Sequence, residues 1–223
     1  MELTNSKQGT SGHSMSLPLF LTAQNKWPVG IAVFIATAFL YLTSNWFHLF
    51  PPRLLPMWWI DRMIPFLPNT VWIYMSEYIY FAVVYFVAKE PDNLNKYLYS
   101  FFAIQVLSVA IFWIIPTTYP RELFPLQDDL NSITYYAFSH LRMADSPANC
   151  CPSLHVSSVF LSSLVFLQEQ RKKFIFFFIW NLLIAVSTLT TKQHYLVDVV
   201  TGIVIACVSY WYFYKKATYQ RWS

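Results

Sequence analysis

The chain has 223 residues, of which 56% are hydrophobic, 20% aromatic and 12% charged, and its formal net charge is +4 at pH 7. An average soluble domain has about 25% charged residues, so this composition argues against a soluble fold and indicates an integral membrane protein. We expect the membrane and a lipid as partners, and no nucleic acid.

Six apolar segments predict six transmembrane helices. A helix needs about 20 residues to cross roughly 30 Å of hydrocarbon, and the fourth and fifth segments are short for this length. The segments are residues 28–47, 70–88, 97–115, 153–168, 174–189 and 195–214. The predicted fold is therefore an all-α integral membrane bundle of six transmembrane helices. It would occupy residues 27–216, between a mobile cytosolic tail at residues 1–26 and a short cytosolic tail at residues 217–223.

The distribution of lysine and arginine predicts the orientation of the bundle. With six spans, ten of these residues fall on the side of the two termini and five on the other side. Because positive charge is enriched in cytosolic loops, we expect both termini in the cytosol. The fourth and sixth segments would then begin on the periplasmic, lumenal or extracellular side.

The connection between the first two segments is rich in proline and tryptophan. Residues 50–68 contain five prolines together with Trp58 and Trp59, a mixture that breaks regular helix and suits the headgroup region. We predict an interfacial hairpin, with a substrate contact as the alternative. Asp61 and Arg62, which are adjacent, could form a local ion pair.

Two polar residues lie inside the next two apolar segments. Glu77 is the only charged residue of the second segment, and a carboxylate at such a place usually faces the bundle interior. It could shape a pocket for a headgroup or serve as a structural group bonded to a neighbouring tyrosine, and both interpretations stay open. Gln105, in the third segment, is expected to hydrogen-bond another helix.

The longest polar stretch inside the domain is residues 116–152, which we predict to be a solvated loop. Arg121 and Arg142 lie in it and could bind phosphate oxygens in bidentate fashion. Asp128 and Asp129 are adjacent but have no third ligand at a set spacing, and no cysteine or histidine pair has the spacing of a zinc site. We therefore expect no metal and no cofactor.

The polar residues at the starts of the fourth and sixth segments predict the chemistry. His194 and Asp198 are four residues apart, so a helix places them on one face. A carboxylate that accepts from one ring nitrogen of histidine prepares the other nitrogen to act as nucleophile or base. His155 could supply a proton to a leaving group, and Ser153, at a helix start, could help bind a phosphate. The alternative is that the two histidines are structural and cap helices.

These residues carry a resemblance to a known family. The sequence PSLH at residues 152–155, Ser187, and HYLVD at residues 194–198 resemble the second and third signature motifs of the type-2 phosphatidic acid phosphatase superfamily, including its inositol phosphorylceramide synthase-like branch. The resemblance implies a six-helix bundle of the phosphatidic acid phosphatase/haloperoxidase type and metal-independent phosphoryl transfer.

The resemblance also implies a role for each motif residue. His194 attacks phosphorus and forms a phosphohistidine, and Asp198 orients it. His155 protonates the leaving oxygen, and Ser153 holds a phosphate oxygen. Water, or the hydroxyl of a second lipid, then releases the phosphoryl group.

The sequence departs from the family pattern at two places. Thr188 follows Ser187 where the family usually has arginine, and the first motif, a lysine followed at a distance by Arg-Pro, is reduced to Tyr-Pro-Arg at residues 119–121. Both changes remove charge that would bind phosphate, and the candidate replacements are Lys192, Arg121 and Arg142. The leucine at position 154 resembles the headgroup transferase branch more than the phosphomonoesterases.

Three functions therefore remain open from the sequence. The first is a lipid phosphatase or lipid headgroup phosphotransferase with its active site on the non-cytosolic face. The second is a catalytically silent relative that binds or moves a lipid phosphate. The third is a structural membrane protein with incidental histidines.

Overall fold

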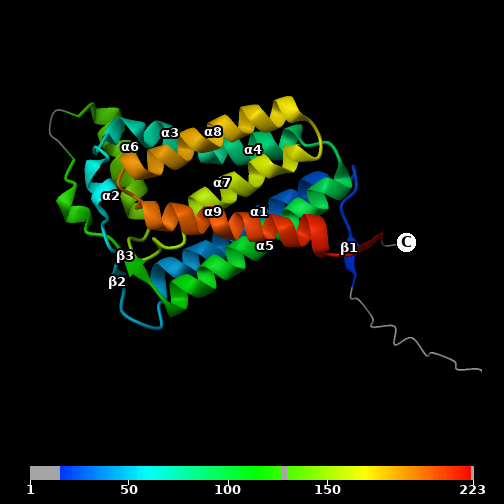
Figure 1. The fold of residues 1–223 in the computed structure, drawn as a ribbon, viewed down its shortest axis with the longest axis horizontal. Coiled ribbons are helices and arrows are strands. Elements are labelled where there is room, and N and C mark those ends of the chain that lie inside the picture. Colours follow the sequence, from blue (N-terminus) through cyan, green and yellow to red (C-terminus); the bar gives the residue numbers. More distant parts are fainter. Residues whose placement is uncertain (1–15, 127–129, 222–223) are drawn as a thin grey trace, which may run out of the picture.

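The protein is an elongated bundle of helices in a computed structural model, which describes residues 16–126 and 130–221 (Figure 1). The helices are α1 (Lys26–Trp46), α2 (Trp59–Met63), α3 (Val71–Met75), α4 (Glu77–Val87), α5 (Pro91–Ile114), α6 (Ser132–Ala144), α7 (Leu154–Leu164), α8 (Arg171–Thr190) and α9 (Leu196–Trp211). Short strands are paired as β1 (Leu17–Leu19) with β4 (Tyr219–Arg221) and as β2 (Arg53–Leu54) with β3 (Thr117–Thr118).

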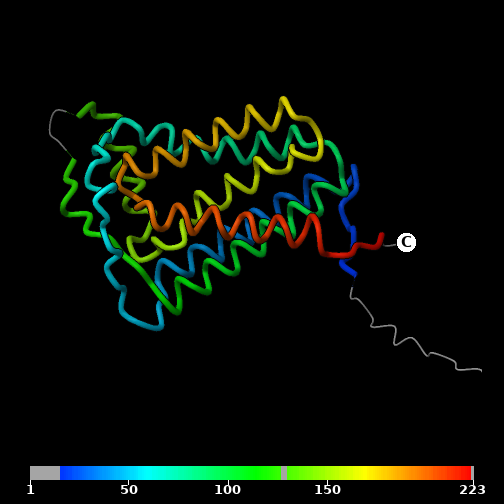
Figure 2. Tube along the Cα trace, in the orientation of Figure 1, coloured from blue at the N-terminus to red at the C-terminus, as the bar shows by residue number. Residues whose placement is uncertain are grey.

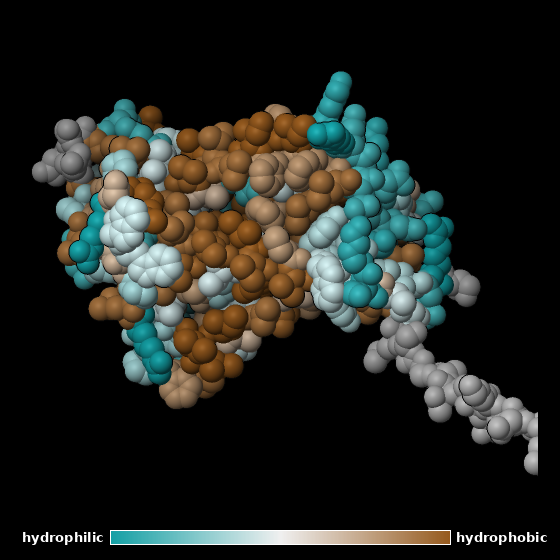
Figure 3. Space-filling view, viewed as in Figure 1, coloured by the Kyte–Doolittle hydropathy of each residue, from teal (hydrophilic) through white to brown (hydrophobic). Residues whose placement is uncertain are grey.

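The predicted all-α membrane bundle is confirmed. Within the described part of the chain, five helices are long and apolar enough to cross a membrane: Lys26–Trp46, Pro68–Val87, Pro91–Ile114, Arg171–Thr190 and Leu196–Lys216. The remaining predicted segment, the fourth, at residues 153–168, is the shorter apolar helix Leu154–Leu167. On the face shown in Figure 3 a belt of hydrophobic side chains crosses the middle of the bundle, and hydrophilic side chains gather toward its ends. This is the distribution expected of a multi-pass membrane protein.

The short helix α7 lies at the centre of the bundle, packed against α4, α5, α8 and α9. Its serines are buried, and small side chains of this kind allow helices in a membrane to approach closely. Tyr97 on α5 shares a hydrogen bond of 2.9 Å with Ser162 of α7. Gln105, also on α5, donates to the Ser158 hydroxyl at 3.0 Å. The prediction that Gln105 bonds another helix is therefore confirmed.

The second predicted span is broken near its middle. α3 ends at Met75 and α4 begins at Glu77, while Ser76 between them donates from its hydroxyl to the Ile73 carbonyl at 2.6 Å. A serine that bonds its own preceding turn competes with regular helix bonding. The break places Glu77 in the first turn of a new helix, facing the interior.

The predicted solvated loop at residues 116–152 contains a helix, so that prediction is wrong for its second half. α6 packs Phe138 and Leu141 against Val71 and Tyr74 of α3. Its N-terminus is capped by Asn131, whose side-chain oxygen accepts from the Ile133 amide at 2.9 Å. Apolar residues at helical spacing were present in the sequence but were masked by the polar residues around them. Asp128 and Asp129 lie outside the described residues.

The tail boundary predicted at residue 26 is also corrected. The side-chain oxygen of Asn95 on α5 accepts from the amides of Phe20 and Leu21, at 3.1 and 3.2 Å. The side chain of Leu21 is buried, and β1 pairs with β4 from the other end of the chain. Residues 16–26 are therefore part of the folded bundle, whereas residues 1–15 lie outside the described part.

The bundle has two different ends. Figure 2 shows β1, the C-terminal segment and the turn between α7 and α8 at one end. The starts of α7 and α9 and the short helices α2 and α6 lie at the other end (Figure 1). All the candidate catalytic residues belong to this second end.

Candidate active site

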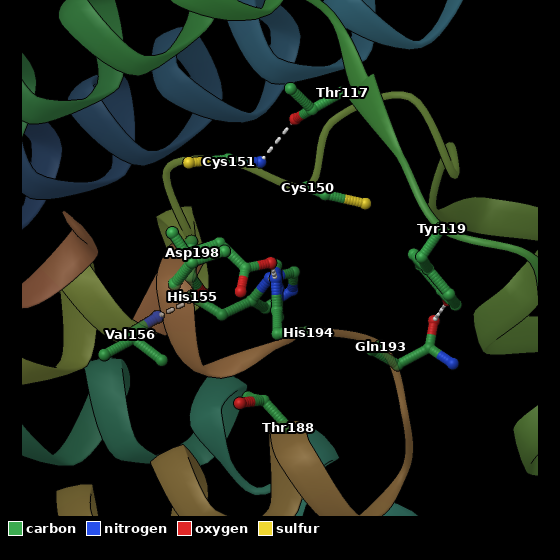
Figure 4. A network of polar contacts seen from close by, with 12 residues as sticks. Thr117, Tyr119, Cys150, Cys151, His155, Val156, Thr188, Gln193, His194 and Asp198 are labelled. Atoms are coloured by element: carbon green, nitrogen blue, oxygen red, sulfur yellow. Dashed lines mark hydrogen bonds and ion pairs between the residues drawn. The ribbon is translucent and has the colours of Figure 1, made fainter. Parts of the chain in front are cut away.

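His194 and Asp198 form a hydrogen-bonded pair, as their spacing predicts. His194 lies just before α9 and Asp198 in its first turn, and His194 Nδ1 is 2.8 Å from Asp198 Oδ2 (Figure 4). Asp198 is fully buried and His194 is 4% exposed. A buried carboxylate that accepts from Nδ1 fixes the ring and the tautomer, leaving Nε2 with its lone pair toward the site.

His155 faces His194 across the site. It lies in the first turn of α7, and its Nδ1 is 3.4 Å from His194 Nε2. The two ring centroids are 5.5 Å apart. The structure thus brings together the three residues predicted to be catalytic, and the free nitrogen of each ring points toward the other histidine.

The outer nitrogen of His155 has two partners that the sequence did not assign to it. His155 Nε2 is 2.7 Å from the Tyr74 hydroxyl and 3.2 Å from Glu77 Oε1. When Nε2 carries a proton it can donate to Glu77, and when it does not it can accept from Tyr74. The sequence left two interpretations of Glu77 open, a pocket wall and a structural group. The structure adds a third and more specific one, because Glu77 contacts a candidate catalytic histidine.

Ser153 joins the starts of α7 and α9. Its hydroxyl caps α7 by accepting from the Val156 amide at 3.3 Å, and its own amide donates to the Asp198 carbonyl at 2.9 Å. A Cβ at Gly202 would lie 2.6 Å from the Ser153 carbonyl oxygen, so the close approach of the two helices depends on glycine at this position. The hydroxyl only accepts in this cap, so its proton could still be donated to phosphate, but Ser153 is fully buried and the site would have to open to admit that contact.

Asp61 holds the start of α9, and the local ion pair with Arg62 that we considered is not formed. Its Oδ1 accepts from the Leu196 amide at 2.8 Å and its Oδ2 from the Trp58 amide at 3.0 Å. The side chain is 2% exposed. The hairpin of residues 50–68 is therefore more than an interfacial anchor, because it fixes the helix that carries Asp198.

Lys192, a predicted phosphate ligand, lies in the loop before α9 and is directed toward the hairpin. Its Nζ donates to the carbonyls of Asp61 and Ile64 at 2.6 and 2.5 Å. Burial lowers the pKa of Lys192, and the nearby charge of Asp61 opposes this effect. The backbone φ of Lys192 is 54°, a region that few residues other than glycine adopt.

Arg121 and Arg142, the other predicted phosphate ligands, also donate hydrogen bonds to other groups of the protein. Arg121 donates to the Tyr119 hydroxyl and to the carbonyls of Arg142 and Asp145, at 2.9, 2.7 and 2.8 Å. Arg142 donates to the Phe124 carbonyl at 2.8 Å, and partial burial lowers its pKa. The structure brings none of the three cations into contact with His155 or His194 within the described residues.

Thr188, at the position where the family usually has arginine, positions the catalytic loop by its backbone. Its carbonyl accepts from the amides of Gln193 and His194, both at 3.1 Å. Gln193 in turn accepts from the Tyr119 hydroxyl at 2.8 Å (Figure 4). The loop that carries His194 is therefore held by α8 and by residues 119–121, without a cation from position 188.

A cavity of about 270 Å³ opens beside His155 between α1, α4, α5 and α7. Glu77, Gln105 and Ser158 supply polar groups to its wall, and the rest of the lining is largely apolar or aromatic. At one edge the Tyr41 hydroxyl is hydrogen-bonded to Asp145. A substrate with a polar head and an apolar body fits such a lining.

Sequence reasoning did not predict the contacts of three residues that support the site. Tyr74 and Glu77 contact His155 from a different span, and Asp61 supports α9 from the hairpin. The signal for Glu77 was present, since an intramembrane carboxylate is costly unless it has a partner. The sequence could not say which histidine was that partner.

The comparison with known families agrees with the site. A family model described as the PAP2 superfamily, the type-2 phosphatidic acid phosphatases, matches residues 38–212. The match includes all the proposed catalytic residues and most of the helical bundle. No curated protein matches the chain. The chain belongs to the type-2 phosphatidic acid phosphatase superfamily, whose general activity is that of lipid phosphatases and phosphotransferases.

Proposed function

We propose that the protein is a membrane lipid phosphate phosphatase or lipid headgroup phosphotransferase that works through a phosphohistidine. The observation that carries the proposal is the geometry of His194, which is bonded to Asp198 through Nδ1 and presents Nε2 to His155. The proposed nucleophile is bonded to its orienting carboxylate and faces the proposed proton donor, and the 3.4 Å between the two ring nitrogens must widen to admit a phosphoryl group.

The first step forms a bond between His194 Nε2 and phosphorus and breaks the bond from phosphorus to the leaving oxygen. The proton of His155 Nδ1 goes to that oxygen, and Glu77 stabilises the protonated His155 through Nε2. In the second step water attacks phosphorus, the P–N bond breaks and His155 takes the proton of the water. If the hydroxyl of a second lipid replaces water, the product is a transferred headgroup.

Phosphate binding requires groups beyond the histidines. Among the described residues, the backbone amides of Leu154 and His155 at the start of α7 have no hydrogen-bond partner, and a helix N-terminus favours an anion. We propose that at least one of Lys192, Arg121 and Arg142 exchanges a carbonyl partner for phosphate when substrate binds.

Turnover by the purified protein tests this proposal. With a panel of lipid phosphates in nanodiscs, we expect release of inorganic phosphate or exchange of headgroup, and we expect it to persist with a chelator because the nucleophile is a histidine. Strict dependence on magnesium would contradict the mechanism. Lipid products that carry a new headgroup would distinguish transfer from hydrolysis.

A catalytically silent relative that binds or moves a lipid phosphate is the second candidate. One observation favours it: Thr188 replaces the expected arginine, and the three nearby cations are bonded to the protein. Binding of lipid phosphate without turnover, unchanged in His194→Ala, would support this candidate.

We also propose that the site opens on the non-cytosolic face, with both termini in the cytosol. The lysine and arginine distribution supports this, and the paired strands β1 and β4 lie at the opposite end of the bundle from the site (Figure 1). In a variant without the three native cysteines, a cysteine introduced at Ser132 should react with an impermeant thiol reagent from outside. Labelling only after the cytosolic face is exposed would reverse the orientation.

A further inference from the structure

A second cavity adjoins the one beside His155. It also has a volume of about 270 Å³ and lies between α1, α4 and α5. Phe34, Tyr78, Phe81 and Phe101 line both cavities. The two cavities therefore follow each other along the same helices, and we call them together the α1/α4 groove.

The lining of the α1/α4 groove changes along its length. Near the site it contains Glu77, His155 and Gln105, whereas the far cavity is lined by apolar and aromatic residues and one glycine. A ligand that matches both parts has one polar end and a long apolar body. This is the chemistry of a phospholipid with its phosphate at the histidines.

The position and length of the groove match an acyl chain in a bilayer. Its lining residues on α1 extend from Trp27 to Leu42, which at 1.5 Å per residue is about 22 Å. Half of a hydrocarbon core is about 15 Å thick, so the groove runs from the site past the bilayer midplane and is long enough for one extended acyl chain. α1 packs along α5 and has little contact with α4, and the groove residues Ile31, Phe34 and Tyr78 are exposed on the surface, so a lipid can enter from the side.

The far end of the groove is closed by Tyr85. Its hydroxyl donates to the Lys26 carbonyl at 2.7 Å, and its ring packs edge-on against Trp27 at 5.9 Å between centroids. The space there depends on Gly30, because a Cβ at this position would lie 2.5 Å from the ring of Tyr85. These residues set where a chain must end.

We propose that the α1/α4 groove holds one acyl chain of the lipid phosphate substrate, with the phosphate at His155 and the chain terminus at Tyr85. This inference rests on the proposed function. It predicts a preference for chain length, set by Gly30, Tyr85 and Trp27.

Substitutions that fill the groove test the proposal by kinetics. Ala38 lines the cavity near the site and Ala82 the far cavity, whereas Ala36 on α1 is exposed and lines neither. Burial of one methylene is worth about fourfold in affinity, so a phenyl ring that displaces three or four methylenes should cost on the order of a hundredfold. We define the chain-length ratio as kcat/KM for long-chain phosphatidic acid divided by kcat/KM for short-chain phosphatidic acid. Ala82→Phe should lower this ratio on the order of a hundredfold.

The matched control is Ala36→Phe, which adds the same ring to the lipid-facing side of α1 and should leave the ratio unchanged. Ala38→Phe should lower kcat/KM for both chain lengths relative to a small water-soluble phosphate ester. Equal effects of Ala82→Phe and Ala36→Phe in folded protein would overturn the proposal.

Photo-crosslinking separates this proposal from the proposed function. Phosphatidic acid with a diazirine at one chain terminus, bound to His194→Ala protein in nanodiscs, should label the lining segments of α1, α4 and α5 at residues 27–34, 78–85 and 97–101. Labels on other helices, in a protein whose wild type turns over lipid phosphates, would overturn the groove and leave the function intact. Labels in the groove of a protein without turnover would support the groove and contradict the enzymatic function.

Discussion

The two histidines of the site obtain their carboxylates in different ways. His194 is paired with Asp198 four residues later in the same helical start, at 2.8 Å. His155 is paired with Glu77 at 3.2 Å, and Glu77 comes from the broken span α3–α4 on another part of the chain. The first pair depends on the geometry of one helix, and the second depends on the packing of α4 against α7. A local pair suits a nucleophile that must stay fixed, and a tertiary pair suits a residue whose proton changes place.

The difference is visible in the number of partners. His194 Nδ1 is bonded to one buried carboxylate oxygen, which keeps a single tautomer. His155 Nε2 lies near both a hydroxyl and a carboxylate, so it has a partner in either protonation state. These surroundings are the reason that we propose His194 as the nucleophile and His155 as the proton donor.

The largest expected effect comes from breaking the local pair. Asp198→Asn keeps the size of the side chain and removes its charge, and the wrong tautomer of His194 then becomes accessible. We expect kcat to fall on the order of ten thousandfold, as for a comparable change in a catalytic triad. The control is Asp92→Asn, which removes an exposed ion pair with Arg221 at the opposite end of the bundle and should leave kcat unchanged. A kcat for Asp198→Asn within about tenfold of wild type would contradict the role of the pair.

The next largest effect concerns the positive charge that binds the phosphate, which neither histidine–carboxylate pair supplies. Lys192→Gln, Arg121→Gln and Arg142→Gln each remove one candidate phosphate ligand. We expect at least one of them to lower kcat/KM by about a hundredfold, because a charged contact to the transition state is worth a few kcal/mol. We expect Lys192 and Arg142 to matter slightly more than Arg121. Lys215→Gln, at the far end of the bundle, is the control, and thermal stability must be measured for each variant.

If all three substitutions retain nearly full activity while His194→Ala is inactive, the phosphate is held elsewhere. The amides at the start of α7 would then stabilise the charge of the phosphate. The proposed difference between the two histidine–carboxylate pairs would not be affected.

A smaller effect distinguishes the tertiary pair from the local one. Glu77→Gln should lower turnover of a lipid phosphate by about tenfold, because it weakens proton donation by His155, a contribution that can reach a hundredfold or more. It should have little effect on p-nitrophenyl phosphate, whose leaving group needs no proton. His155→Ala should lower turnover of both substrates, and that of the lipid phosphate more, because it removes the proton donor of the first step and also the base of the second. Equal losses with both substrates would show that Glu77 acts only in folding.

The smallest effect tests the support of the local pair. Asp61→Ala removes the carboxylate that accepts from the amides of Leu196 and Trp58. We expect the free energy of unfolding to fall by about 1–3 kcal/mol, since a hydrogen bond to a charged group is lost in a buried place. Thermal melting in detergent measures the change, and the exposed Glu122→Ala is the control. An unchanged melting temperature would mean that α9 is held without the hairpin.

Local patterns made much of the molecule predictable from the sequence. Apolar length predicted the spans to within a few residues, with α5 beginning at Pro91 instead of residue 97 because its first turns carry buried asparagines. The spacing of four residues predicted the pair of His194 and Asp198. The contacts of Glu77, Tyr74 and Asp61 could not be predicted, because each joins elements far apart in the chain and depends on how the bundle packs.

The orientation of the predicted phosphate ligands was unpredictable for a related reason. Lys192 lies in a loop beside His194, as its use in the site requires, but a positive φ and two carbonyls of the hairpin direct its amino group away. Position in the sequence places a side chain near a site, whereas loop conformation decides where it points.

The central claim is that His194 carries the phosphoryl group, and trapping the phosphorylated protein tests it most directly. In His155→Ala protein given radiolabelled p-nitrophenyl phosphate, the first step needs no proton donor, but the second step loses its base. The account predicts that a base-stable, acid-labile phosphohistidine accumulates at His194 and is absent from the His155→Ala/His194→Ala protein. Label on another residue, or phosphate release at full rate from the double variant, would contradict it.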